Sequence, residues 1–264
     1  MFSKLVGVIL ILIGIAGLVL PIVPGILLIM AGILLFSRNK AAIDWVHVKE
    51  ELKARERIGL DDHSERGLAI SKSLDESLAK AISLSKPNYT QKVKKITHIG
   101  EDFIELEGGV RFSSGKISDY IKGASHVVIY LVTIGEGIEN AAGVETKGKE
   151  PLDGYLLDRL GSFAVESLAE AVEKNIRKDY SILRKSVSRR YSPGYCDWPI
   201  EEQRILAKIL DFSKIGVSLT ESCMMKPKKS ISAIVGIANK GVFTKSGSTC
   251  EICEKKDCSY RRVS

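Results

Sequence analysis

The hydrophobic pattern divides the chain into two unequal parts. Residues 5–36 form one apolar run of 32 residues without a charged side chain, and the sequence Pro-Ile-Val-Pro-Gly interrupts it at 21–25. The run is too long for the apolar core of a signal peptide, and no small-residue cleavage site follows it. One kinked span fits this pattern, and so does a helical hairpin that turns near 21–25.

The flanking charges favour the hairpin. Lys4 precedes the apolar run, while Arg38 and Lys40 follow it. Positively charged residues tend to stay on the cytoplasmic side, so this arrangement places both ends there. We therefore expect residues 1–40 to be a membrane anchor in contact with lipid, and the remaining domain to lie in the cytoplasm.

The pattern after residue 40 predicts a mixture of helices and strands. Residues 41–57 read as an amphipathic helix with Ile43, Val46 and Leu52 on its apolar side, and residues 68–85 as a second helix. Alternating or continuous apolar runs predict strands at 95–99, 103–106, 110–112, 126–133, 217–220 and 230–237. Helical spacing predicts a turn of helix at 118–121, a long helix over 152–179 and a shorter one over 200–211. This order indicates an α+β class, with linker helices at 41–85, a main domain at 86–240 and a tail at 241–264.

Composition narrows the class of protein. The chain has 264 residues, 27% of them charged, and a net charge of +7. These values exclude a collagen, a coiled coil, a disordered chain and a polytopic transporter. Because the positive charge is mild and spread along the chain, it does not indicate nucleic acid as a partner.

The cysteines gather near the C-terminus. Five cysteines are too few for a secreted disulfide scaffold, and three of them form the pattern Cys250-x2-Cys253-x4-Cys258. Three thiolates at this spacing can hold zinc or an iron–sulfur cluster, although both usually need a fourth ligand, which Cys196 or Cys223 could supply. Redox or disulfide use, and plain inert thiols, remain alternatives.

The most unusual local sequence is the string Arg-Arg-Tyr-Ser-Pro-Gly-Tyr at 189–195. Pro193-Gly194 makes a tight turn, Arg190 offers a planar fork that suits a carboxylate, and Tyr195 offers a ring face and a hydroxyl. Such a loop could hold a zwitterionic or cationic small molecule. The alternative is a basic loop between structural units.

The pattern Arg190-x-x-x-Gly194-Tyr195 resembles the signature of the activation domain of cobalamin-dependent methionine synthase, most of all in free-standing proteins of anaerobes. Further similar motifs occur in the same order, and the resemblance covers roughly residues 86–264. They are Thr133-Ile134-Gly135, Gly161-Ser162-x-Ala164-Val165-Glu166, Asp197-Trp198-Pro199, Glu202-Gln203, Leu219-Thr220-Glu221-Ser222, Met225-x-Pro227 and Lys229-Ser230. One departure is Cys196, where such relatives often have glycine.

This resemblance implies a central antiparallel sheet with flanking helices and a site for S-adenosylmethionine (AdoMet). Arg190 would pair with the methionine part of the ligand, and Ser192, Pro193, Gly194 and Tyr195 would line the site. Glu166 would face the ligand's ammonium or sulfonium, unless it is merely a solvated residue on its helix. The resemblance implies no catalytic residue. Its partners would be an electron donor and a corrinoid-carrying protein, or a methionine synthase that lacks its own activation domain.

The expected function is therefore that of a membrane-tethered AdoMet-binding protein that supports reductive methylation of cobalamin on a partner, as an activation subunit of methionine synthase. The alternative is a membrane-bound adaptor that binds metal or an iron–sulfur cluster and has no AdoMet-dependent activity. A methyltransferase of the common doubly wound fold is disfavoured, because no glycine-rich loop follows a first strand.

Overall fold

The computed structural model describes residues 41–56, 64–148, 151–243 and 257. The expected membrane anchor at 1–40 and the residues Cys250, Cys253 and Cys258 lie outside this part of the chain. Within it, none of the helices combines the length and the apolar character needed to cross a bilayer. The same residues contain no group of His, Cys, Asp and Glu side chains placed to hold a metal ion.

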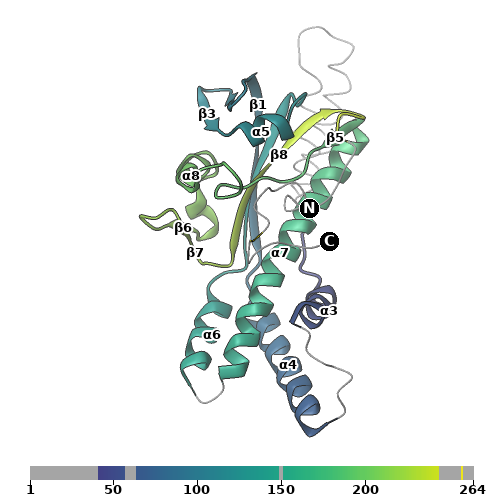
Figure 1. Cartoon of the computed structure of the whole chain (residues 1–264), viewed down its shortest axis with the longest axis vertical. Helices are drawn as coiled ribbons and strands as arrows, with labels where there is room; N and C mark the ends of the chain where they lie inside the picture. The colour runs from purple at the N-terminus through teal and green to yellow at the C-terminus, as the bar shows by residue number, and fades with distance from the viewer. Residues whose placement is uncertain (1–40, 57–63, 149–150, 244–256, 258–264) are drawn as a thin grey trace, which may run out of the picture.

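A six-stranded sheet, antiparallel throughout, forms the centre of the fold (Figure 1), in the order β3-β2-β1-β4-β8-β5. Its strands are β1 (Asn88–Ile99), β2 (Phe103–Leu106), β3 (Val110–Ser113), β4 (His126–Thr133), β5 (Lys185–Val187) and β8 (Ser230–Asn239). Strand β4 pairs along its whole length with both β1 and β8. A separate two-stranded ribbon joins β6 (Ser218–Leu219) and β7 (Met225–Lys226).

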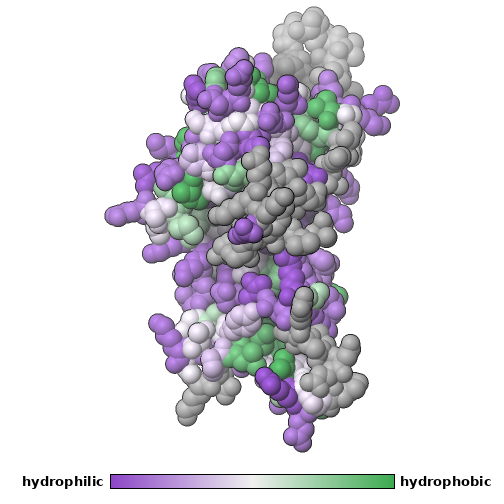
Figure 2. Space-filling model, viewed as in Figure 1, coloured by the Kyte–Doolittle hydropathy of each residue, from purple (hydrophilic) through white to green (hydrophobic). Residues whose placement is uncertain are grey.

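The helices cover both faces of the sheet and extend beyond one end of it (Figure 1). They are α3 (Trp45–Glu56), α4 (Glu65–Leu84), α5 (Gly115–Tyr120), α6 (Gly137–Lys147), α7 (Pro151–Ile182) and α8 (Gln203–Leu210), with short 3-10 turns at Ile200–Glu202 and Phe212–Ile215. Among the coloured residues of Figure 2, hydrophilic ones predominate and hydrophobic ones gather in small separate patches.

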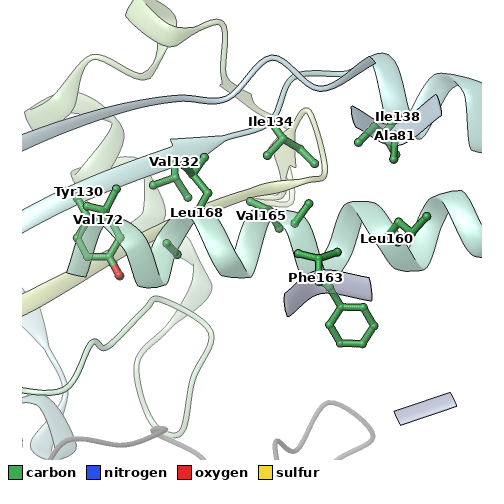
Figure 3. Packing of buried hydrophobic residues seen from close by; sticks show 14 of the residues in the cluster. Ala81, Tyr130, Val132, Ile134, Ile138, Leu160, Phe163, Val165, Leu168 and Val172 are labelled. Carbon is green, nitrogen blue, oxygen red and sulfur yellow. The ribbon is translucent and has the colours of Figure 1, made fainter. Parts of the chain in front are cut away.

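The long helix α7 packs on one face of the sheet and organises the larger core. Val132 and Tyr130 of β4 meet Leu168 and Val172 of α7 in this cluster (Figure 3). Helices α3 and α4 contribute Leu52, Leu74 and other side chains to the same cluster. The N-terminal helices therefore share one core with the sheet.

The opposite face of the sheet carries a second core under α5 and α8. Val127, Ile129 and Leu131 alternate with the β4 residues of the first core and pack with Leu206 and Leu210 of α8. Because alternate side chains of a strand point to opposite faces, a strand covered on both sides needs an unbroken apolar sequence. This requirement explains the run His-Val-Val-Ile-Tyr-Leu-Val-Thr of β4.

The prediction of an α+β class with an antiparallel sheet and flanking helices is confirmed. The predicted strand at 126–133 and the long helix are present, and the helix begins one residue earlier and ends three residues later than predicted. Helix α6 and strand β5 were not predicted, and β1 begins seven residues earlier than expected. The expected orientation of the first helix is wrong in one respect: Val46 is exposed, and Val48 is the buried residue.

Candidate functional site

The loop after β5 is held against strand β8. The backbone of Tyr191 exchanges two hydrogen bonds with Ile234, at 2.9 and 2.8 Å, and the Ser188 amide donates to the Gly236 carbonyl. Successive side chains of extended backbone point to opposite sides. Tyr191 accordingly enters the core under α8, whereas Arg190 contacts α7 on the other face.

Two buried aromatic rings anchor the turn that follows. Tyr191 and Trp198 stack nearly parallel, with ring centroids 5.7 Å apart and an angle of 6° between the planes. The Trp198 indole donates a hydrogen bond of 2.6 Å to Glu202, whose carboxylate also accepts from the Ser113 amide. The Tyr191 hydroxyl lies 3.1 Å from both the Tyr195 carbonyl and Asp197. These contacts hold the segment 191–198 in place from its buried side.

Gly194 adopts a conformation that favours glycine. Its φ is +88°, and a Cβ at this position would lie 3.1 Å from the Cδ1 of Ile200. The Gly194 amide donates a hydrogen bond of 2.8 Å to the Trp198 carbonyl, which closes the turn. The dihedral angle therefore favours glycine, and a methyl group at this position would require the end of the Ile200 side chain to shift.

Arg190 is the centre of a charged network beneath this turn. Its guanidinium lies 2.7 Å from Glu166 and 3.4 Å from Glu173, both on α7. The buried Tyr130 hydroxyl donates to Glu173 at 3.1 Å. Burial by itself would lower the pKa of Arg190, but Glu166, Tyr130 and Glu173 together hold that pKa well above its ordinary value. Arg190 therefore carries a positive charge in this network.

The Arg190–Glu166 ion pair forms part of the wall of a pocket of about 400 Å³. It lies between α7, the loop after β5, the β6–β7 ribbon and the first residues of β8. The lining residues are Glu166, Arg190, Ser192, Pro193, Tyr195, Ile200, Gln203, Thr220, Cys223, Met224, Met225, Lys226, Lys228, Ser230, Ile231 and Ser232. Pockets of this size and mixed lining hold small molecules and cofactors.

The structure brings the residues singled out in the loop and on the long helix together. Arg190, Ser192, Pro193, Tyr195 and Glu166 all line the pocket, and Gly194 shapes the turn beside it. Glu166 is not a solvated helix residue, since it pairs with Arg190. Arg177 of the same helix donates hydrogen bonds to the carbonyls of Val187 and Ser188, at the start of the loop.

Several pocket residues escaped prediction. Gln203, Cys223 and Ile200 line the pocket but were not named as residues of the AdoMet site. Gln203 accepts a buried hydrogen bond of 2.8 Å from Ser232. Glu173, which completes the network around Arg190, was not named at all. Its spacing of seven residues from Glu166 places both carboxylates on the same side of α7, and this periodicity was the available signal.

Comparison with known proteins identifies related domains. The family model described as the activation domain of vitamin B12 dependent methionine synthase matches residues 33–245. The matched range begins well before residue 86, where the sequence resemblance was expected to begin. A solved structure entitled the crystal structure of the MetH reactivation domain bound to AdoHcy is similar, with a TM-score of 0.54 and 19% identity over 78% of this chain and 76% of that one. No curated protein matches.

Proposed function

The chain belongs to the family of activation domains of vitamin B12 dependent methionine synthase, and we propose that it binds AdoMet in the pocket around Arg190. The supporting observation is that this single pocket unites Glu166 of α7 with the Arg190–Tyr195 loop. The similar reactivation domain was solved with AdoHcy, which is AdoMet without its transferable methyl group.

The pocket offers both kinds of surface that such a ligand needs. Ile200, Met224 and Met225 provide apolar and polarisable contacts for a purine ring and a sulfonium, while Glu166 provides a negative charge. The exposed ring of Tyr195 stands at the same pocket. We infer that the nucleoside lies against the apolar side chains and that the charged end of the ligand lies near Glu166.

The proposed activity is the presentation of AdoMet to a corrinoid-carrying partner. An electron donor reduces the partner's Co(II) to Co(I), and the Co(I) electron pair attacks the methyl carbon of the sulfonium. The carbon–sulfur bond breaks, its electron pair stays on sulfur, and methylcobalamin and AdoHcy result. This transfer requires no general base, so the role of this chain is positioning and exclusion of competing reactions.

We further propose that residues 1–40 tether the domain to a membrane on its cytoplasmic side. The supporting observation is the apolar run at 5–36 with Lys4, Arg38 and Lys40 at its ends. A zinc ion or iron–sulfur cluster on Cys250, Cys253 and Cys258 remains a prediction from the sequence pattern.

Calorimetric titration of the full chain with AdoMet in detergent or lipid nanodiscs tests the proposal. We expect binding in the micromolar range or tighter, and a large loss in Arg190→Ala. Arg66→Ala, which removes an exposed arginine of α4, serves as the matched control and leaves binding unchanged. Circular dichroism establishes that each variant is folded.

A second measurement tests the activity itself. The full chain, AdoMet, a reductant and a cob(II)alamin-loaded corrinoid protein are combined, and methylcobalamin formation is followed by its absorbance. Absence of AdoMet binding at millimolar concentration would overturn the proposal, as would equal binding by the folded Arg190→Ala variant.

A further inference from the structure

The segment that leads from β7 into β8 forms one wall of the pocket, which we call the 226–232 wall. The lining residues that it contributes are Lys226, Lys228, Ser230, Ile231 and Ser232. Lys229 lies in the middle of this wall but does not belong to the lining, and only 11% of its side chain is exposed. The contacts of this covered lysine show what it does for the wall.

The side chain of Lys229 is bound to α7. Its ammonium lies 2.7 Å from the Asp158 carboxylate and donates a hydrogen bond of 2.8 Å to the Ser162 hydroxyl. Gly161 leaves room for the lysine, since a Cβ at that position would lie 3.3 Å from the Cε of Lys229. A covered ammonium is stable only where such partners compensate for its lost hydration. The charge of Lys229 thus ties the wall to the helix.

Backbone contacts join the same wall to its other neighbours. The Lys229 carbonyl accepts a hydrogen bond of 3.2 Å from the Ile134 amide, just after β4. The Ser230 hydroxyl donates to the Thr133 hydroxyl at 2.9 Å, and the Lys228 amide donates to the Glu139 carboxylate of α6 at 2.7 Å. The sequence motifs at 133–135, 161–162 and 229–230 therefore meet at one place, beside the pocket.

The opposite wall of the pocket is tied to the same side of α7. Asp158, Ser162 and Glu166 follow one another at intervals of four residues, which places them along one side of a helix. Glu166 pairs with Arg190 of the loop after β5, as described above. One helix thus holds both walls, the loop through Arg190 and the 226–232 wall through Lys229. The spacing between the walls depends on both contacts.

We propose, on the basis of the AdoMet-binding function above, that Lys229 is a positioning residue of the pocket. It holds the 226–232 wall against α7, at the spacing from the 190–195 loop that the ligand requires, and it does not touch the ligand itself. Without its ammonium the wall moves away from α7, so AdoMet affinity falls while the rest of the domain keeps its fold.

The first variant is Lys229→Met, which keeps a long apolar side chain and removes the ammonium. Hydrogen exchange of the ligand-free full chain in detergent reports on the wall directly. We expect the Ile134 and Lys228 amides, whose acceptors are Lys229 and its neighbour Glu139, to exchange about tenfold faster, the size expected for loss of a hydrogen bond to a charged group. In calorimetric titration the dissociation constant of AdoMet should rise by about the same factor.

A second variant removes the partners of Lys229 instead. Asp158→Ala/Ser162→Ala changes two side chains that are at least partly exposed on α7, and neither of them lines the pocket. It should reproduce both effects, and combining it with Lys229→Met should add no further loss. The matched control is Lys80→Met, which breaks the ion pair between α4 and Glu145 of α6 and should leave both measurements unchanged. Circular dichroism establishes that every variant is folded.

The outcomes separate this inference from the proposed function. If the wild-type chain binds AdoMet and the folded Lys229→Met variant binds it equally well, the inference is wrong and the proposed function stands. Unchanged exchange at Ile134 and Lys228 would also overturn the inference, as would an equal loss of affinity in Lys80→Met. If the wild-type chain binds no AdoMet, both the proposed function and this role of Lys229 are overturned.

Discussion

Arg190 and Glu166 form an ion pair of 2.7 Å although 24 residues separate them in the chain. The pair links the loop after β5 to the long helix and forms part of the pocket wall. Glu173 lies 3.4 Å from the same guanidinium, so the arginine pairs with two carboxylates at once. The geometry of the pocket therefore depends on a contact between two distant elements.

This contact predicts that Arg190 and Glu166 are energetically coupled in their effect on stability. Arg190→Ala leaves Glu166 and Glu173 close together without their shared cation, and we expect it to lower the free energy of unfolding by about 3 kcal/mol. Glu166→Ala should lower the free energy of unfolding by less, because Arg190 retains its ion pair with Glu173. In a double-mutant cycle measured by urea unfolding, the coupling should be about 1–2 kcal/mol.

The exposed pair Lys72–Glu76 on α4 provides the control for this cycle. Its two side chains are 79% and 65% exposed, so the coupling should be below about 0.5 kcal/mol. Equal coupling in the two pairs would contradict a structural role for the Arg190–Glu166 contact.

Substitution of Gly194 is predicted to be harmful for two separable reasons. Gly194→Ala forces a side chain into φ +88° and places its Cβ near Ile200, so it should destabilise the fold by about 1–2 kcal/mol and weaken AdoMet binding. Gly216 has φ +73° with nothing within 4 Å of its potential Cβ. Gly216→Ala should therefore show the conformational cost alone and leave AdoMet affinity unchanged. Unfolding and calorimetric titration measure the two effects.

Asp197 is predicted to make stability depend on acid pH. Burial alone would raise its pKa, but hydrogen bonds from the Ser114 hydroxyl, the Lys116 amide and the Tyr191 hydroxyl outweigh this and lower it. A carboxyl whose pKa is lower in the folded state stabilises the fold above its ordinary pKa of about 3.9, and this stability is lost as the pH falls through the folded value.

The corresponding variant is Asp197→Asn. Because Asp197 is partly exposed, we expect it to cost only about 1 kcal/mol at pH 7 and progressively less as the pH falls below about 4. Asp119→Asn, at an exposed position of α5, is the control and should follow the wild type at every pH. Urea unfolding at a series of pH values gives the comparison, and a constant difference between Asp197→Asn and wild type would be the contrary result.

Helices and strands are easiest to predict from the sequence where one physical requirement acts along a local segment. Strand β4 is apolar at nearly every position because both of its faces are covered, and α7 has the helical spacing of a buried face. Helix α6 was missed because its sequence contains glycines, which weaken helical propensity, and because its buried side chains are only Ile138 and Ala142. Strand β5 has three residues, too few for a period to be read.

The candidate site could be predicted only in part, for a related reason. The residues of the 190–195 loop are consecutive and form a recognisable string, whereas the contacts that fix the loop join distant segments. Trp198 packs on Phe112, and Asp197 accepts from Ser114, more than 80 residues earlier. No local pattern encodes such contacts, because they depend on how the sheet and the helices close around them.

Cys196 occupies a position where the backbone favours glycine. Its φ is +52°, in the left-handed region that disfavours a residue with a Cβ. Cys196→Gly should therefore raise the free energy of unfolding by about 0.5–1 kcal/mol. Cys196→Ala keeps the Cβ and should bring no such gain, so the pair of variants separates backbone strain from loss of the thiol. Thermal or urea unfolding measures both, and a gain in Cys196→Ala equal to that in Cys196→Gly would argue against the strain.

Trp198 is predicted to support ligand binding although it does not line the pocket. It stacks on Tyr191 and donates to Glu202, and its carbonyl accepts from the Gly194 amide. Trp198→Phe retains an aromatic ring but loses the hydrogen bond to a charged group, so we expect a loss of about 1.5–3 kcal/mol in stability. Because the backbone contact to Gly194 then lies in a less rigid segment, AdoMet affinity should fall as well.

The matched variant for this prediction is Phe112→Leu. Phe112 is buried in the same cluster and packs edge-on against Trp198, at 5.2 Å between ring centroids, but its side chain has no polar atom with which to hold the 190–195 loop. It should reduce stability by about 1–2 kcal/mol with little effect on AdoMet binding. Titration with AdoMet, under conditions where both variants are fully folded, compares their affinities. An equal loss of affinity in the two would mean that the loop responds to the stability of the whole core rather than to its attachment through Trp198.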